Sequence, residues 1–470
     1  MAKTVLKMQL FVDPASREVL DGQSRMCNWL YNHLLETTNV LKEKFKETKD
    51  PVIGKVIYSK RGLRNLVPKI KTEHPFLKCV HSSPLKNTAL RLTDAIEKHQ
   101  KMKKSKHVGW PKFRSWKAGW FSLLYDEPNK GFFIQDGTLT ISLGRGQDKT
   151  TRSLSVRLDD ASVVRDKKIR NLRINKEFDR YYAIFTLEKT LPELKPTRTL
   201  LALDPNHKNL SYGVDTEGQA LEIAAPLWLK IFDKRIDELK AKRDRCKKIS
   251  QSRPVLDALS NPTGKKYTIP SKRWNCYQRA LQRTYQKRRE QTKAFLFTTA
   301  NRLYKLYDGI AIGDYTPHGQ GITPSMRRGM NNRSLIGRFK QTLSWVAQKS
   351  GKVFLEFEEK GTTRTCSTCL FIKEDGIPLS QRQWQCPCCN TVHIRDENAA
   401  QNGLRKVLRN FAEKSEVLTS QVSCSDLAIK QRWAWCVKPS GVEITSRGNY
   451  SDYIAAPGNL NEGMVALDQM

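Results

Sequence analysis

Four cysteines in the last third of the sequence occur as two Cys-x-x-Cys pairs. The first pair is Cys366 and Cys369, the second is Cys386 and Cys389, and sixteen residues separate them. That spacing lets two short turns place four thiolates around one tetrahedral Zn²⁺ ion, whereas a lone pair would favour a redox or incidental role. We therefore expect one structural Zn²⁺. Cys388 lies between the last two ligands and could replace Cys389, so the fourth ligand stays open at this point.

Two carboxylates far apart in the sequence each lie at the boundary of a predicted element. The apolar stretch TLLALD ends in Asp204, and a turn and a second strand at 210–214 follow it. Asp396 comes shortly after the last cysteine pair, where the segment RDENAA begins a helical pattern. An Asp at the end of a strand is usually a turn former. A sheet that brought both carboxylates together could hold two Mg²⁺ ions and hydrolyse a phosphodiester.

The segment 362–404 resembles the C-terminal signature of the TnpB family. It reads TTRTCSTC, then the second cysteine pair, then RDENAAQN. TnpB proteins are transposon-encoded RNA-guided nucleases, related to the Fanzor proteins and to the CRISPR type V effectors. The resemblance implies an α+β multidomain fold. An N-terminal β-barrel with a helical insertion would precede an RNase H-like (RuvC) α/β domain that a zinc ribbon interrupts, and Asp396 would be the last catalytic carboxylate.

The second catalytic carboxylate departs from the usual family pattern. In much of the family a glutamate ends the strand that reads DGIAIGD here, but this sequence has Gly313 at that position. Some members, the Fanzor proteins among them, resemble this sequence in lacking that glutamate and carry another one on the strand before the zinc motif. The motif offset gives Glu359 this role, so the expected catalytic set is Asp204, Glu359 and Asp396. Three other carboxylates stay open as alternatives: Asp314, Glu356 and Glu358.

The charge of the chain indicates a polyanionic partner. Lys and Arg number 83 against 47 Asp and Glu, a net charge of +36 over 470 residues. Such an excess repels itself unless a polyanion covers much of the surface. No apolar run approaches the roughly 18 residues of a membrane-spanning helix, and the first residues do not read as a secretory signal. We expect an intracellular protein without a membrane partner, cytoplasmic in a bacterium and nuclear in a eukaryote.

Two basic regions are candidates for contact with nucleic acid. In the segment 101–120, lysines and arginines alternate with aromatic residues, which could meet phosphates and stack on bases. Aromatic anchoring of a loop is at least as good an interpretation for Trp110 and Phe113. The long helical and basic region 226–307 could hold a heteroduplex or be a solvated surface. The candidate residues are Lys112, Arg114, Trp116, Lys117, Arg273, Arg279 and Arg283.

The pattern of hydrophobic residues and the resemblance together predict five parts. They are a β-barrel (wedge) domain at 1–14 and 107–192, a helical recognition domain at 15–106, a RuvC domain at 197–361 and 391–410, a zinc ribbon at 362–390, and a largely disordered tail at 411–470.

The resemblance implies an RNA-guided DNA endonuclease of a transposable element, with guide RNA and double-stranded target DNA as partners. It would use two catalytic Mg²⁺ ions and one structural Zn²⁺, and the oligomeric state stays open. Gly313 motivates an alternative, a nuclease-dead RNA-guided DNA-binding protein. A strand-transfer transposase without guide RNA is a third reading. A zinc-ribbon DNA-binding factor would leave Asp204 unexplained.

Overall fold

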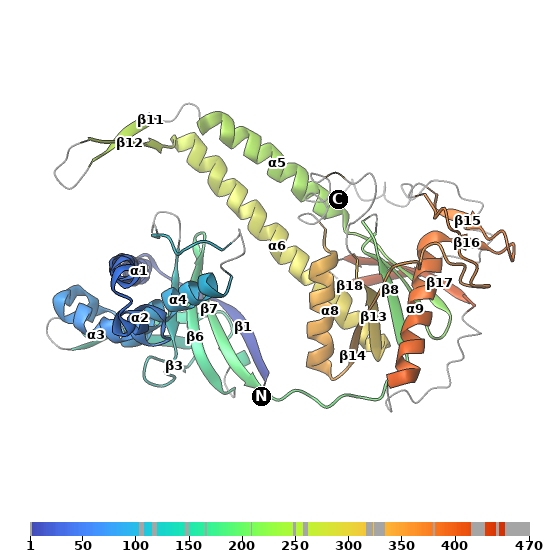
Figure 1. The fold of residues 1–470 in the computed structure, drawn as a ribbon, viewed down its shortest axis with the longest axis horizontal. Helices are drawn as coiled ribbons and strands as arrows, with labels where there is room; N and C mark the ends of the chain where they lie inside the picture. The colour runs from blue at the N-terminus through green and yellow to red at the C-terminus, as the bar shows by residue number, and fades with distance from the viewer. Residues whose placement is uncertain are drawn as a thin grey trace. The chain divides into compact units, whose positions relative to one another are not determined.

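The computed structural model consists of two compact units, Met1–Thr190 and Leu191–Met470, which we describe separately (Figure 1). The residues that the structure describes are 2–102, 108–114, 120–145, 150–164, 167–207, 209–247, 251–256, 262–315, 323, 334–378, 381–414, 428–438 and 441–446.

The first unit contains a curled antiparallel sheet of seven strands in the order β2-β6-β7-β1-β5-β4-β3. The strands are β1 (Ala2–Phe11), β2 (Ser122–Tyr125), β3 (Phe132–Gln135), β4 (Thr138–Arg145), β5 (Thr151–Leu158), β6 (Ile169–Glu177) and β7 (Arg180–Lys189). Asp136 and Gly137 join β3 to β4 with φ values of 45° and 77°, as a two-residue hairpin turn requires. The hairpins predicted in this region are confirmed, and closure of the sheet into a barrel stays a prediction.

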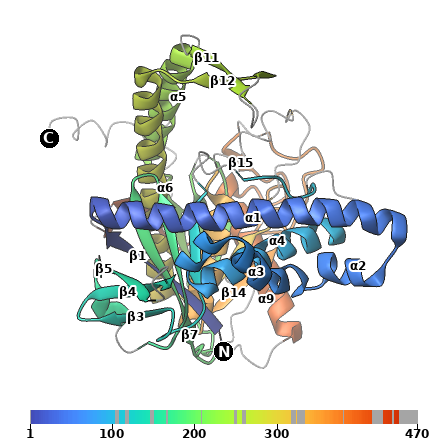
Figure 2. The same ribbon diagram turned by 90° about the vertical axis from the view of Figure 1, so that its left-hand side faces the viewer.

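Helices inserted between β1 and β2 pack against this sheet. They are α1 (Pro14–Thr48), α2 (Pro51–Tyr58), α3 (Gly62–Glu73), the 3₁₀ helix η1 (Pro75–Cys79) and α4 (Ser82–Lys101). The carboxylate of Asp13 accepts the backbone N–H of Ser16 and so caps α1, which Pro14 begins. Leu30 and Leu34, one turn apart, are fully buried in the core that the helices share with the sheet. Figure 2 shows α4 beside the long α1. The helical insertion predicted here is confirmed.

The second unit contains a seven-stranded mixed sheet in the order β14-β13-β8-β9-β10-β17-β18. The strands are β8 (Leu200–Pro205), β9 (Ser211–Asp215), β10 (Gln219–Ile223), β13 (Gly309–Gly313), β14 (Val353–Phe357), β17 (Gln431–Lys438) and β18 (Gly441–Ser446). β13 runs parallel to both β8 and β14, while β9 runs antiparallel to β8 and to β10. The strand–acid–turn–strand arrangement expected around Asp204 is therefore confirmed.

Helices cover both faces of this sheet. They are α5 (Leu227–Lys247), α6 (Lys272–Leu306), α8 (Ile336–Ser350) and α9 (Arg395–Lys414). Side chains alternate along β8, so Leu201 and Leu203 pack with α6 and α8, whereas Leu200 and Ala202 pack with α9. This alternation decides which strand residues can meet a group on α9. The mixed α+β class predicted from the sequence is confirmed.

Two hairpins depart from the sequence-based expectations. β11 (Gln251–Leu256) and β12 (Pro262–Ile269) pair within the region predicted to be helical. β17 and β18 form within 411–470, predicted to be a largely disordered tail, because β17 pairs in parallel with β10 and Trp435 is buried in the core. The pairing partner of β17 lies some 200 residues earlier in the chain, so the sequence around β17 does not reveal it. None of the described helices is long and apolar enough to cross a membrane.

Candidate metal centre and carboxylate site

The sheet directs two of the predicted carboxylates to the face that α9 covers. Asp204 alternates in step with Leu200 and Ala202, both of which pack against α9. Asp396 lies in the first turn of that helix. Backbone N–H groups at a helix start carry partial positive charge, which favours a carboxylate there. The strand end and the helix start together bring Asp204 and Asp396 to one place.

Glu359 fills the space that a side chain at position 313 would need. A Cβ added to Gly313 would overlap Oε1 of Glu359 and would lie only 2.7 Å from its Cδ. Gly313 is opposite Phe357 in the parallel pairing of β13 and β14, and Phe357 packs on the α9 side of the sheet. The missing side chain at 313 therefore leaves room for the carboxylate of Glu359.

Hydrogen bonds hold Glu359 in this place. Its backbone N–H donates to Oδ1 of Asp314 at 3.1 Å, and the backbone N–H of Tyr315 donates to the Glu359 carboxylate. The N–H and hydroxyl of Thr362 both donate to the carbonyl oxygen of Glu359, at 3.0 Å and 2.8 Å. Asp314 and Tyr315, which follow β13, and Thr362, which follows Glu359, thus fix the orientation of the glutamate.

Glu359 and Asp396 both lie close enough to Asp204 for their charges to affect it. Burial, and then the charges of Glu359 and Asp396, raise the pKa of Asp204 well above its ordinary value. Burial and the charge of Asp314 raise the pKa of Glu359 to about 7. Oε1 of Glu359 is buried and has no hydrogen-bond partner. Crowded carboxylates with an unpartnered oxygen fit a site for divalent cations, since a cation relieves the repulsion.

The alternative carboxylates are placed differently. Glu356 is exposed and pairs with Nζ of Lys340 on α8 at 2.8 Å, so it lies on the other face of the sheet. Glu358 is also exposed. The carboxylate of Asp314 accepts the backbone N–H of Glu359, which makes it a support for that residue.

The four predicted zinc ligands converge. The Sγ atoms of Cys366, Cys369, Cys386 and Cys389 lie within 4.8 Å of one another, and two of the S–S separations are 3.6 Å. Zn–S bonds of about 2.3 Å in a tetrahedron require sulfur atoms about 3.8 Å apart, so this cluster fits Zn²⁺. Cys388 is exposed and outside the cluster. The geometry therefore favours Cys389 as the fourth ligand.

The two cysteine turns have the same backbone geometry. Leu370 N–H donates to Cys366 O at 3.0 Å, and Asn390 N–H donates to Cys386 O at 2.9 Å. Leu370 and Asn390 have positive φ values of 65° and 55°. The short strands β15 (Gln383–Gln385) and β16 (Val392–Ile394) flank the second turn, and β16 leads directly into α9. Equivalent turns of this kind let each Cys-x-x-Cys pair present both sulfurs to one ion.

Two asparagines tie the cysteine-bearing segment to α9. Asn398 accepts the backbone N–H of Ser367 at 2.8 Å and donates to Thr365 O at 2.8 Å. Asn402, one turn later, donates to Thr362 O at 2.9 Å. Both asparagines are buried. Both belong to the RDENAAQN motif, whose spacing alone indicated no role for them. In the structure they couple the cysteine-bearing segment to the helix that carries Asp396.

Other residues around the site were not anticipated. Arg382, just before β15, pairs with Oδ2 of Asp396 at 3.1 Å. The hydroxyl of Tyr315 and Nε2 of His207 are 2.6 Å apart and link the segments that follow β13 and β8. Arg432 pairs with Glu397, next to Asp396. Each of these contacts joins residues far apart in the chain, so sequence spacing gave no signal for them.

A groove of about 930 Å³ opens on the α8 side of the sheet, where Lys340 and Glu356 lie. Asp314 and Tyr315, which hold the glutamate, are part of its wall, and Trp345 of α8 is 40% exposed within it. The other lining residues are Ser334, Ile336, Gly337, Arg338, Lys340, Gln341, Ser344, Gln348, Phe354 and Glu356.

The predicted nucleic-acid-binding residues have different environments. Lys112 is exposed, but the guanidinium of Arg114 lies 3.6 Å from the ring centre of Tyr31 and 4.3 Å from that of Trp120, which favours a packing role for Arg114. Trp116 and Lys117 lie outside the described residues. The exposed candidates on α6 are Arg273, Arg279 and Arg283.

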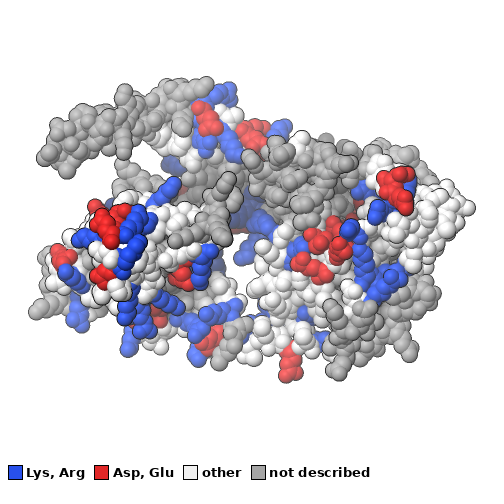
Figure 3. Space-filling model, viewed as in Figure 1, with Lys and Arg blue, Asp and Glu red and all other residues white. Residues whose placement is uncertain are grey.

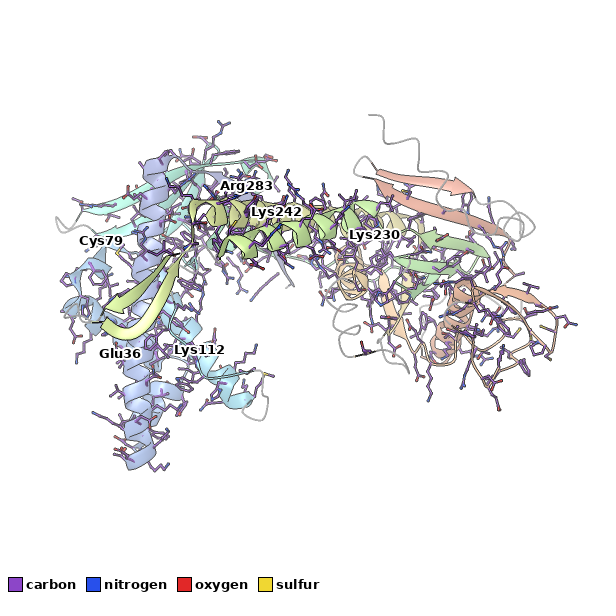
Figure 4. All side chains as sticks on the ribbon, turned by 90° about the horizontal axis from the view of Figure 1, so that it is seen from above. Glu36, Cys79, Lys112, Lys230, Lys242 and Arg283 are labelled. Carbon is purple, nitrogen blue, oxygen red and sulfur yellow. The ribbon has the colours of Figure 1, made fainter. Side chains whose placement is uncertain are left out.

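Basic side chains are widespread on the described surface. On the face drawn in Figure 3, Lys and Arg occur over both units, with Asp and Glu in smaller groups among them. Figure 4 locates Lys230 and Lys242 on α5 and Arg283 on α6. The two helices pack on each other through Ile236 and Leu281, among other residues, so their outer faces are available for charged groups.

Comparison with known proteins agrees with the resemblance seen in the sequence. Residues 337–402 match the family model described as Cas12f1-like, TNB domain. Two TnpB-like proteins of Acanthamoeba polyphaga mimivirus are each 26% identical over 160 residues, which is 33% of this chain and 30% of each viral protein. This chain therefore matches about a third of the length of those relatives.

The fold also has a counterpart among solved structures. The cryo-EM structure of a Cas12f1–sgRNA–target DNA complex contains a chain that aligns with a TM-score of 0.52, at 12% identity and with 83% of both chains covered. At this identity the likeness concerns the fold alone. The TNB-domain match and the viral TnpB-like relatives support the resemblance of this chain to the TnpB and CRISPR type V family.

Proposed function

We propose that this protein is an RNA-guided DNA endonuclease of a transposable element that cuts target DNA by two-metal hydrolysis. The likeness to the TnpB and type V family supports an RNA-guided nuclease at the level of the family. The observation that carries the proposal for this chain is the position of Glu359. Its carboxylate fills the space left by Gly313 and perturbs Asp204, so a third carboxylate is available although the usual position lacks one.

The residues present fit the proposed metal ions. Asp204, Glu359 and Asp396 would hold two Mg²⁺ ions, and the unpartnered Oε1 of Glu359 supports this. When bound, such a pair of ions activates water and stabilises the departing 3′ oxygen of a phosphodiester.

The chain's own residues orient the carboxylates. The carboxylate of Asp314 accepts the backbone N–H of Glu359, and the backbone N–H of Tyr315 donates to the Glu359 carboxylate. The asparagines of α9 hold the helix that presents Asp396. Arg382 places a positive charge beside Asp396, where a phosphate would approach. The groove along α8, with the exposed ring of Trp345, is a proposed path for a DNA strand. Each of these groups would position a metal ligand or the substrate, and none of them is needed to transfer a proton.

The proposed zinc has a structural role. Four thiolates fill a tetrahedral site and leave no position for water or substrate, so such an ion organises the fold. Because the ribbon contacts α9 through Asn398 and Asn402, it would also stabilise the start of the helix that carries Asp396.

Guide RNA and double-stranded target DNA are the proposed partners. A net charge of +36 supports extensive contact with phosphates, and the exposed arginines of α6 together with Lys112 are the proposed contacts. Such contacts follow the backbone of a duplex and leave sequence recognition to base pairing.

The proposed function predicts that a defined RNA co-purifies with the full-length protein and directs cutting. The RNA would be sequenced, and a DNA target matching its guide segment would be incubated with the complex in Mg²⁺. We expect cleavage by the wild type and RNA-dependent binding without cleavage by Asp204→Ala. Binding without any cutting by the wild type would favour the nuclease-dead binder, and the absence of enriched RNA would contradict RNA guidance.

A further inference from the structure

Arg432 of β17 forms a buried, two-pronged ion pair beside the carboxylate site. Its Nε donates to Oε2 of Glu397 and its Nη2 donates to Oε1, both at 2.9 Å. The two side chains are only 10% and 7% exposed. The hydroxyl of Tyr212 on β9 donates to Oε2 of the same glutamate at 3.3 Å. Glu397 directly follows Asp396 in the first turn of α9.

The sheet directs Arg432 towards α9. β17 pairs in parallel with β10, which sets Arg432 opposite Ala220. Ala220 packs on the α9 side of the sheet, whereas the neighbouring Trp433 and Trp435 pack with the core on the α6 side. Because side chains alternate along a strand, the register of this one strand pair determines where the guanidinium lies.

The geometry of the pair makes its loss consequential. Removing one partner of a buried ion pair leaves an uncompensated charge, which is more harmful than removing both. Lysine keeps the charge of arginine but cannot form the planar, bidentate contact. The start of α9 is therefore fixed to the sheet by a contact that a conservative substitution does not reproduce.

Asp396 is held from two directions. Arg382, next to the zinc-binding segment, contacts its carboxylate directly. Arg432 lies on β17, near the edge of the sheet that is opposite to β14, and it acts through Glu397 in the same helical turn. A shift of this turn would move Asp396 relative to Asp204, which stays on β8.

We infer that Arg432 is a positioning residue for the carboxylate site: through Glu397 it fixes the first turn of α9 and with it Asp396. Strand β17 is then part of the functional unit, although it lies in the region 411–470, which was predicted to be a largely disordered tail. The inference rests on the proposed function in one respect, because Asp396 is taken as a ligand of the divalent ions.

The test measures metal binding separately from cutting. Mn²⁺ is titrated into RNA-free full-length protein, and free Mn²⁺ is followed by electron paramagnetic resonance. We expect Arg432→Gln to bind Mn²⁺ about tenfold more weakly than the wild type, since loss of groups that support metal ligands typically costs 10–100-fold in affinity. The Mg²⁺ concentration for half-maximal cleavage should rise by a similar factor, with KM for target DNA nearly unchanged.

Three further variants make the result specific. Arg432→Lys should be affected about threefold, less than Arg432→Gln, and it carries the test if Arg432→Gln does not fold, as judged by zinc content and melting temperature. The double variant Glu397→Gln/Arg432→Gln should bind Mn²⁺ no more weakly than Arg432→Gln. Arg170→Gln, which removes a more exposed ion pair with Glu188 in the first unit, should match the wild type.

The outcomes separate this inference from the proposed function. If Arg432→Gln lowers only the melting temperature and leaves both the Mn²⁺ affinity and the Mg²⁺ requirement unchanged, Arg432 is merely structural and the inference is wrong. If the wild type never cuts DNA but Arg432→Gln still weakens Mn²⁺ binding, the inference holds and the nuclease proposal fails.

Discussion

Glu359→Gln is expected to lower target cleavage more than about 100-fold while RNA-guided binding to DNA persists. Even groups that only support a metal ligand typically contribute 10–100-fold, so loss of the ligand's charge should have a larger effect. Glutamine preserves the size of the side chain in the space beside Gly313, so the fold should be retained. Cleavage and binding of a labelled target would be measured on the same RNA-bound sample.

Glu358→Gln is the matched control for this experiment. It removes the same charge one residue earlier, from an exposed side chain, and should cut like the wild type. Full activity of Glu359→Gln would overturn the assignment and redirect attention to Asp314, the nearest other carboxylate, which contacts the backbone N–H of Glu359.

Cys386→Ser is expected to release one zinc per chain and to unfold the segment before α9. Structural zinc sites have apparent binding free energies of about 10–16 kcal/mol, and in small metal-bound segments this is folding free energy. The described hydrophobic core of this segment is small, because its buried members are Trp384 and the two cysteines Cys366 and Cys386. Because Asn398 and Asn402 bond to the same segment, cleavage should be lost as well.

Zinc content is measured by elemental analysis of the purified protein, and stability by thermal unfolding. Cys388→Ser is the control, since Cys388 is exposed and lies outside the sulfur cluster, and it should keep its zinc. Unchanged zinc in Cys386→Ser, or loss of zinc in Cys388→Ser, would contradict the ligand set.

The parts of the site that follow local rules could be predicted from the sequence. Cysteine spacing is set by the geometry of a turn, so the convergence of the four cysteines could be predicted. The strand that ends near Asp204 and the helix that begins at Asp396 each have local signals, an apolar run and a change to small residues. Such signals need no knowledge of distant partners.

The contacts that join distant segments could not be predicted in this way. β17 lies in a region whose pattern predicted disorder, and it pairs with β10, far earlier in the chain. Arg114 stands in a basic, aromatic segment that suggested contact with nucleic acid, but Tyr31 and Trp120 enclose its guanidinium. In both cases the environment comes from residues far away in the chain, and this decides the role.

The position of Glu359 could be predicted from the sequence only in part. The offset from the cysteine motif singled it out, but spacing alone left Glu356 and Glu358 open. Alternation of side chains along the strand separates Glu359 from both. The absence of a Cβ at Gly313 then provides the space for its carboxylate.

In the proposed site, Glu359 takes the place of a glutamate at position 313. Exchanging the residues at the two positions is the decisive test of this role. A glutamate at 313 needs the space that the side chain of residue 359 fills, so the exchange is Gly313→Glu with Glu359→Gly. Cleavage of the RNA-matched target in Mg²⁺ is compared for the wild type, Glu359→Gly and the double variant. We expect Glu359→Gly not to cut. The double variant should regain cleavage, at least about tenfold above the single variant, because one metal ligand is restored. Cleavage by Glu359→Gly at the wild-type rate would contradict this role of Glu359.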